Sequence, residues 1–196
     1  MNRLSIILSL LLISILLTGC SSKQALDPRP SVDLVDSSVA ITNDSAIAGG
    51  TRITEGEKKG QLIVPTVLHY KFTLKNDGLT AINENYESSR GLELMIVPSD
   101  KLKAISQDTV GFNIFDPMSY TGGLGYCSTS LYYLKPGGQT ELTLIYELGV
   151  SEINPNVTVL VPSEEELNEL LNYASDADLI VMVDGLEVER FDLSLQ

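Results

Sequence analysis

Few side chains in this sequence can carry out covalent or metal chemistry: it has two cysteines, Cys20 and Cys127, and one histidine, His69. A hydrolytic dyad or a zinc site normally uses more imidazoles, or clustered thiolates. The patterns G-x-S-x-G, H-E-x-x-H and C-x-x-C and the Walker phosphate loop do not occur. We therefore expect a protein that is not an enzyme and has no cofactor, with His69 at an exposed strand position.

Cys20 is the best candidate for covalent modification because of the residues that precede it. One cation, Arg3, is followed by an apolar run from Leu4 to Leu17, and the small residues Thr18 and Gly19 lead to the cysteine. A helix over this run would be about 21 Å long, shorter than the roughly 30 Å core of a bilayer. This is the layout of a secretory signal peptide, with an uncleaved membrane helix as the alternative.

The segment Leu17-Thr18-Gly19-Cys20 resembles the lipobox of bacterial lipoproteins. The resemblance implies cleavage between Gly19 and Cys20 and attachment of acyl chains such as palmitate at Cys20. One buried chain holds a protein only marginally, whereas two or three give a stable anchor. We expect a lipoprotein that is anchored in the cell membrane and faces outside the cytoplasm.

The charge of the chain narrows the choice of partners. Removal of residues 1–19 takes away one of the 13 basic residues and none of the 26 acidic ones, which moves the net charge from −13 to −14. Nucleic acids and anionic lipid headgroups require a cationic face, so neither is expected as a partner. The acidic surface permits calcium or a basic partner, although it also serves simply to keep the domain solvated.

We expect three segments along the chain: a signal peptide over residues 1–19, a lipidated cysteine and tether over 20–36, and one domain over 37–196. The tether contains Pro28 and Pro30 and shows no periodicity. With Cys20 lipidated, Cys127 has no disulfide partner within the chain. Unpaired cysteines are mostly buried as small hydrophobic residues, so we expect a buried Cys127 rather than a reactive thiol.

Alternation of apolar and polar residues predicts several β-strands in the domain. A strand over 67–75 ends at the turn 76–78, and Asp184-Gly185 predicts a two-residue hairpin turn. We also expect a strand in the β-branched segment 156–162. The residues expected to share core faces are Leu68, Tyr70, Phe72, Leu74, Leu92, Leu94, Ile96, Leu142, Leu144, Tyr146 and Leu148.

The last strand changes the phase of its alternation. Leu186 and Val188 alternate in one phase, and Phe191 and Leu193 in the other. Both sets can face one core only if the strand bulges near residues 189–190. We therefore predict a β-bulge at that place.

One helix of about three turns is predicted over residues 163–174. Ser163 and Glu166 have the spacing of a capping box, and the leucines that follow fall on one helical stripe. A second, weaker helical turn is expected after Ser99.

Many short strands separated by turns favour two packed antiparallel sheets, a mainly β fold. The segments HYKFTLKNDG (69–78) and YLKPGGQTELTLIYEL (133–148) resemble two landmarks of small immunoglobulin-like domains in lipoproteins of Gram-positive bacteria. The resemblance implies an immunoglobulin-like antiparallel β-sandwich with one short helix, and a binding or accessory role. The insertion between about 98 and 132 and the helix over 163–174 depart from the pattern.

A group of tyrosines forms the candidate binding loop: Tyr120, Tyr126, Tyr132 and Tyr133, with several glycines between the first two. Tyrosine on a flexible backbone offers a large amphipathic contact area with few rotatable bonds, as in antibody loops. The alternative is that the tyrosines pack and the glycines serve turns. The loop predicts a site for protein or carbohydrate.

Metal ions are not expected to bind. The spacing of an EF-hand loop is absent, so a calcium site would have to be assembled from separate loops. Asp176 and Asp178, just before a buried strand, are the weak candidates for such a site.

The sequence thus predicts a membrane-anchored, extracytoplasmic lipoprotein that binds a protein or a cell-envelope polymer without catalysing a reaction. A small-solute or calcium-binding lipoprotein is the alternative, followed by a hydrolase. The sequence does not identify the partner.

Overall fold

The computed structural model describes residues 30–83, 91–131 and 133–195. Gly19, Cys20 and Tyr132 lie outside the described residues, as does the expected signal peptide. The described chain is mainly β, with antiparallel sheets and few helices, which confirms the predicted fold class at this level.

The larger sheet has four strands in the order β1-β4-β7-β6. They are β1 (Val32–Thr42), β4 (Thr66–Asn76), β7 (Gln139–Gly149) and β6 (Tyr126–Ser128), all antiparallel to their neighbours. The predicted alternation in β4 is confirmed, because Leu68, Tyr70, Phe72 and Leu74 are each at most 1% exposed.

The predicted turn after β4 is confirmed and is held by a buried side chain. The amide nitrogen of Asn76 donates to the carbonyls of Thr80 and Leu134, and its oxygen accepts from the amide of Gly78 at 3.0 Å. These bonds satisfy the Asn76 side chain, which is fully buried.

The smaller sheet has three strands in the order β5-β8-β9: β5 (Leu92–Pro98), β8 (Ala177–Val183) and β9 (Leu186–Asp192). The predicted hairpin turn between β8 and β9 is confirmed. Asp184 and Gly185 have φ values of 56° and 76°. Positive φ at both positions is the requirement of a type I′ turn, which matches the twist of the flanking strands.

The predicted bulge in β9 is confirmed to within one residue. Val181 pairs with Glu189 and Met182 pairs with Glu187, so Val188 is the extra residue. The bulge does not bring both apolar sets into the core, however, because Leu186 is 70% exposed while Leu193 is buried.

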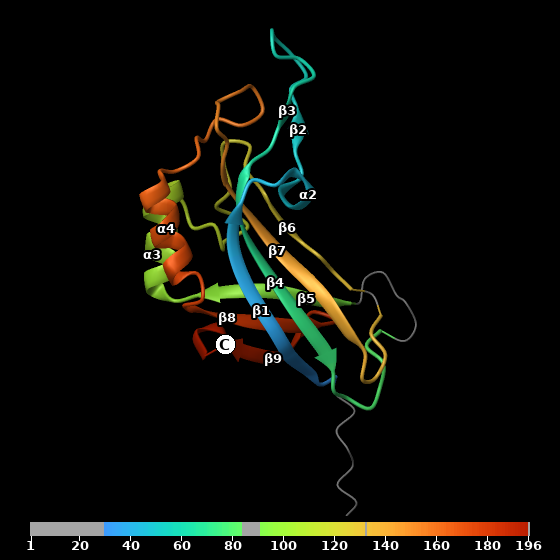
Figure 1. The fold of residues 1–196 in the computed structure, drawn as a ribbon. Helices are drawn as coiled ribbons and strands as arrows, with labels where there is room; N and C mark the ends of the chain where they lie inside the picture. Colours follow the sequence, from blue (N-terminus) through green and yellow to red (C-terminus); the bar gives the residue numbers. More distant parts are fainter. Residues whose placement is uncertain (1–29, 84–90, 132, 196) are drawn as a thin grey trace, which may run out of the picture.

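The two sheets pack on each other around one hydrophobic core to which both contribute buried residues. In Figure 1 the strands β5, β8 and β9 cross behind β1, β4 and β7 in a clearly different direction. A separate two-stranded hairpin, β2 (Thr51–Arg52) and β3 (Leu62–Ile63), projects from one end of the larger sheet, beside the short helix α2 (Ser45–Ala48).

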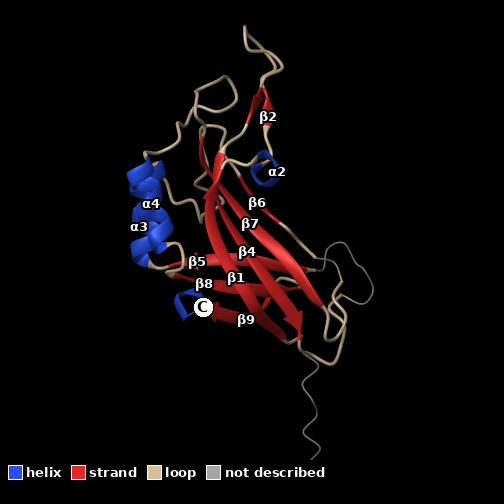
Figure 2. Cartoon of the chain, in the orientation of Figure 1, coloured by secondary structure: helices blue, strands red, loops and turns tan. Residues whose placement is uncertain are grey.

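Two longer helices, α3 (Asp100–Val110) and α4 (Glu164–Tyr173), lie together at one side of the sheets, as Figure 2 shows. The predicted capping box of α4 is confirmed: Ser163 and Glu166 each bond to the backbone amide of the other. The turn predicted after Ser99 is in fact the three-turn helix α3, capped by the Ser99 hydroxyl. The 3₁₀ turn η1 (Leu193–Leu195) follows β9.

Two predictions about extended segments are wrong. Residues 32–36, assigned to the tether, belong to β1 and pair with β4, and Val32 is buried in the core. Residues 156–162 form no strand. Thr158 donates one backbone hydrogen bond to Gly122, and Val159 and Val161 bond to Val150 around an isolated bridge between Val150 and Leu160. Because β7 ends at Gly149, this contact does not extend into a ladder.

Candidate binding groove

A groove of about 330 Å³ lies between β5 and β6, on the side where the edges of the two sheets approach each other. Its floor is made by β7, and its walls come from β5, from β6 with the residues after it, and from the loop after α3. The lining residues are Glu93, Leu94, Met95, Ile114, Phe115, Pro117, Tyr126, Ser128, Ser130, Leu144, Tyr146 and Met182. We call this space the groove.

Among the described tyrosines of the candidate loop, Tyr126 lines the groove. It begins β6, pairs with Tyr146 and is 48% exposed. An exposed aromatic ring beside an apolar floor offers contact area without a large ordering cost. Tyr126 therefore has the position expected of a contact residue.

Tyr120 supports this wall instead of facing a ligand. Its hydroxyl donates to the carbonyl of Ile114 at 2.9 Å, and its ring lies 5.1 Å from Phe112 and 5.6 Å from Tyr126. Burial raises the pKa of the Tyr120 hydroxyl, with a smaller effect of Tyr146. The structure thus brings Tyr120 and Tyr126 together, while Tyr133 is half-buried and does not line the groove.

Tyr146 makes a rigid floor. The centroid of its ring lies 5.1 Å from that of Phe115 and 6.0 Å from that of Tyr70. Both pairs meet edge to face, which is a favourable arrangement for aromatic rings. Burial raises the pKa of Tyr146, and a backbone hydrogen bond with Ile96 partly offsets this effect. The hydroxyl thereby ties the floor to β5.

The ionisable groups near the groove are acidic. Glu93 lines it and is exposed, and the lining residues that the structure describes include no lysine, arginine or histidine. Glu147, half-buried beside Tyr126, accepts a 2.7 Å hydrogen bond from the amide of Gly125. Burial raises the pKa of Glu147, and the bond from Gly125 lowers it less. The groove is suited to an apolar group with a cation nearby.

Cys127 is exposed, so the expectation of a buried cysteine is wrong. It pairs with Ile145 on β6, a strand of only three residues at the edge of the sheet. Its neighbours Tyr126 and Ser128 line the groove, so strand alternation turns Cys127 to the outer face. An edge position leaves nothing to cover the thiol.

His69 occupies the outer face of β4, where the sequence places it, between Ala40 and Ile145 on the neighbouring strands. It is half-buried rather than exposed. Burial lowers the pKa of His69, and the nearby Lys71 lowers it further. The imidazole does not line the groove.

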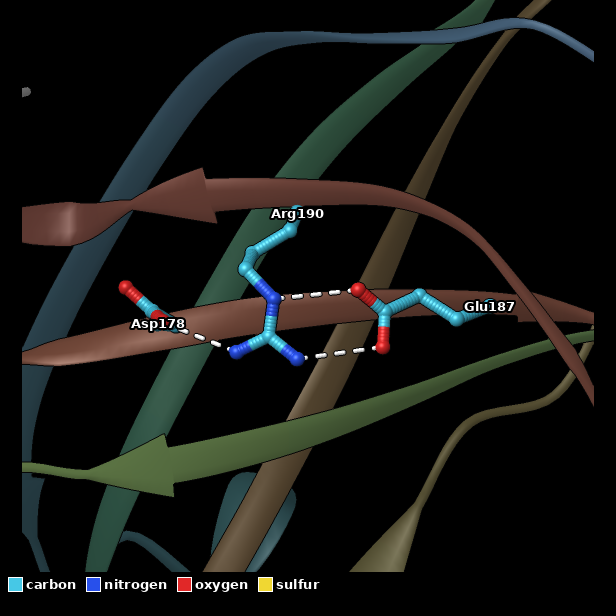
Figure 3. Close-up of polar contacts among 3 residues, drawn as sticks. All are labelled: Asp178, Glu187 and Arg190. Atoms are coloured by element: carbon cyan, nitrogen blue, oxygen red, sulfur yellow. Dashed lines mark hydrogen bonds and ion pairs between the residues drawn. The ribbon is translucent and has the colours of Figure 1, made fainter.

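The two weak calcium candidates already have partners. The Ser99 hydroxyl donates to Asp176 at 2.7 Å, and Arg190 donates to Asp178 at 2.9 Å. Arg190 also forms two 3.0 Å bonds to Glu187, so it lies between two carboxylates, as Figure 3 shows. In the part of the chain that the structure describes, no three ligating side chains are placed to hold a metal ion.

Sequence reasoning missed the wall contributed by Ile114, Phe115 and Pro117. This segment has no strand or helix periodicity, and it is positioned by contacts with Tyr120 and Tyr146. Phe112 and Phe115 were the available signal, since two of the four phenylalanines fall in this short stretch.

Comparison of the chain with protein-family models found no match, and comparisons with curated proteins and with solved structures found none either. Among the helices of the described ranges, none combines the length and apolar character that crossing a membrane would require.

Proposed function

We propose that the chain is a membrane-anchored, extracytoplasmic lipoprotein whose domain binds a protein or a cell-envelope polymer in the groove, without catalysis. The observation that carries this proposal is the exposed ring of Tyr126 beside an apolar space of about 330 Å³. Exposed apolar surface in a concave site is typical of recognition surfaces. The polar groups of the lining are carboxyl and hydroxyl groups without a neighbouring base, which is a poor set for acid–base chemistry.

An immunoglobulin-like β-sandwich is part of the proposal. The order β1-β4-β7-β6 opposite β5-β8-β9 supports it. In the constant-type immunoglobulin domain, the first, second, fifth and fourth strands form one sheet, and the third, sixth and seventh form the other. If the small β2-β3 hairpin is set aside, the seven remaining strands have this order. Because fold alone does not specify function, the binding role rests on the groove.

The anchor is supported by the segment Leu17-Thr18-Gly19-Cys20 and the apolar run before it. We propose that Gly19 and Cys20 flank the cleavage site and that Cys20 carries the acyl chains. The domain then faces outside the cytoplasm, with its acidic surface in water.

Binding of a small solute is the competing function. The groove volume lies near the lower end of the roughly 300–1,000 Å³ range of small-molecule sites. Such sites usually enclose most of their ligand, whereas this groove is only partly enclosed. An open groove favours a partner that is longer than the groove.

A photo-crosslinking side chain at position 126 in the full-length chain, in the cells that make it, tests the proposal. We expect one dominant partner, identified by mass spectrometry or by polymer analysis. The matched control carries the same side chain at position 186, which is also exposed but begins β9 after the hairpin turn and does not line the groove. Equal products at both positions, or none from the anchored protein, would contradict binding in the groove.

A further inference from the structure

We infer that the partner is a protein and that a short, extended, basic segment of it binds in the groove as an added strand on the edge of β5. This inference rests on the proposed function and specifies the chemistry of its partner. Strand addition uses main-chain hydrogen bonds for affinity and alternate side chains for specificity.

The backbone of β5 is open toward the groove. Leu92 exchanges two hydrogen bonds with Leu131, of 2.9 and 3.2 Å, so its amide and carbonyl point away from β8. Along an antiparallel strand, the backbone amide and carbonyl of every second residue point to the same side, so those of Leu94 also point away from β8. Among the described strands β5 pairs only with β8, and β6 pairs with β7.

The length of the open edge is limited at both ends. The contact with Leu131 closes one end, and the hydrogen bond between Ile96 and Tyr146 occupies the other. Pro98 at the end of β5 cannot donate a ladder hydrogen bond. The added segment is therefore short, with its central residue opposite Leu94.

Strand alternation sets which side chains the segment needs. A residue paired with Leu94 points its side chain to the same face as Leu94, which is the core side, toward Leu144 and Phe115 in the groove. Its two neighbours point to the outer face, where β5 displays Glu93 and Met95. The central side chain is therefore apolar, and its neighbours meet a carboxylate and a thioether.

Charge complementarity makes the neighbour that lies beside Glu93 basic. Glu93 is exposed, and no ion pair occupies it within the described residues. The described part of the lining has no cation, and the whole chain carries a net charge of −13. A lysine or arginine beside Glu93 gains favourable electrostatics and faster association, whereas an acidic segment is repelled.

The probe is the peptide acetyl-Thr-Lys-Leu-Lys-Thr-amide, measured by calorimetry against the full-length chain in lipid nanodiscs. We expect a Kd below about 1 mM, the modest affinity of a short segment with few contacts. Methylation of the leucine amide nitrogen should weaken binding at least tenfold, because it removes the donor to Leu94 and leaves the side chain in place. The acidic peptide acetyl-Thr-Glu-Leu-Glu-Thr-amide should bind at least tenfold more weakly.

Glu93→Lys should weaken binding of the basic peptide at least fivefold. The matched control Glu169→Lys makes the same charge change on the exposed face of α4, which contributes nothing to the groove, and should alter binding less than twofold. Thermal unfolding of both variants shows whether they remain folded. In hydrogen exchange, the peptide should slow exchange at the Leu94 amide and leave that of Glu93, already paired to β8, unchanged.

Absence of binding, indifference to methylation, or equal binding of the acidic peptide would overturn the inference. A concentration-dependent dimer would also overturn the inference if the protection of the Leu94 amide from hydrogen exchange is lost on dilution. That result would show that a second copy of the chain covers the edge of β5. Crosslinking at position 126 is read separately. If the chain binds none of the peptides but still crosslinks to one partner at position 126, the proposed function stands and only strand addition is overturned.

Discussion

The hydroxyl of Tyr70 donates a 2.8 Å hydrogen bond to the carbonyl of Ala174 inside the core. Ala174 is the C-cap of α4, and the carbonyls of the last helical turn have no partner within a helix. The bond therefore joins the central strand β4 to the end of α4, residues far apart in the sequence. Burial raises the pKa of Tyr70, so the hydroxyl keeps its proton and remains a donor.

Tyr70→Phe should destabilise the domain by about 1–3 kcal/mol, because it leaves the buried carbonyl of Ala174 without a partner. Urea unfolding of the purified protein measures the change. Tyr173→Phe is the matched control: among the described residues, that hydroxyl has one hydrogen bond, which it accepts from the exposed Lys101 at 2.6 Å. An equal loss of unfolding free energy in both variants would show that the buried hydrogen bond contributes no more to stability than the exposed one.

Tyr120 and Tyr126 should respond differently to replacement by alanine. Tyr120→Ala removes a half-buried ring and a hydrogen bond, and we expect a loss of about 2–4 kcal/mol. Tyr126→Ala should cost less than about 1 kcal/mol, because the ring is largely exposed. Chemical unfolding separates them, and similar losses would mean that Tyr126 is also structural.

Gly123→Ala should destabilise the loop before β6 strongly, by more than about 2 kcal/mol. At φ +82° a Cβ is strained, and here it would also overlap the carbonyl oxygen of Asn156. Gly60, at φ +88° with open space around it, isolates the conformational effect, and Gly60→Ala should cost about 1 kcal/mol. Equal thermal unfolding of the two variants would argue against close packing at Gly123.

Glu147→Gln should stabilise the domain at neutral pH. Burial raises the pKa of this carboxyl above its ordinary value of 4.5, so the ionised form is disfavoured in the folded state. The destabilisation is absent below the ordinary pKa and complete above the folded pKa. The gain in melting temperature should therefore be present at pH 7 and vanish near pH 4, and a gain independent of pH would contradict this account.

Glu166→Gln should have the opposite pH dependence. Hydrogen bonds from the Ser163 hydroxyl and amide lower the pKa of Glu166, so its ionised form stabilises the fold. This contribution is complete above the ordinary pKa of 4.5 and is lost as the pH falls through the folded pKa. Thermal unfolding should show a less stable variant at pH 7 and a shrinking difference on acidification; a constant difference would point to lost packing.

Local signals predicted the parts of the fold that local interactions determine. The capping box of α4, the Asp184-Gly185 turn and the alternation of β4 all appear in the structure where the sequence indicated them. β1 was missed at its start because, as an edge strand, it carries acids and serines over residues 33–38. The segment 156–162 shows the converse: β-branched composition favours a strand, but pairing requires a neighbour with free backbone groups.

The candidate site was only partly predictable for the same reason. Tyr126 could be singled out because tyrosines are common in recognition loops. Tyr120 turns inward because its hydroxyl bonds to the carbonyl of Ile114 and its ring packs on Phe112. These contacts depend on how residues 111–120 fold, which the sequence pattern does not indicate. The edge of β5 is open because β6 pairs with β7, and no local sequence pattern indicates that pairing.

The early start of β1 limits how far the domain can stand from a membrane. With the proposed anchor at Cys20, the chain enters the sheet at Val32, where it pairs with Asn76. The dozen or so residues between these points span at most about 40 Å when fully extended. Such an anchor would therefore hold the domain within a few nanometres of the lipid surface, and a protein partner would have to present its segment in that same narrow layer.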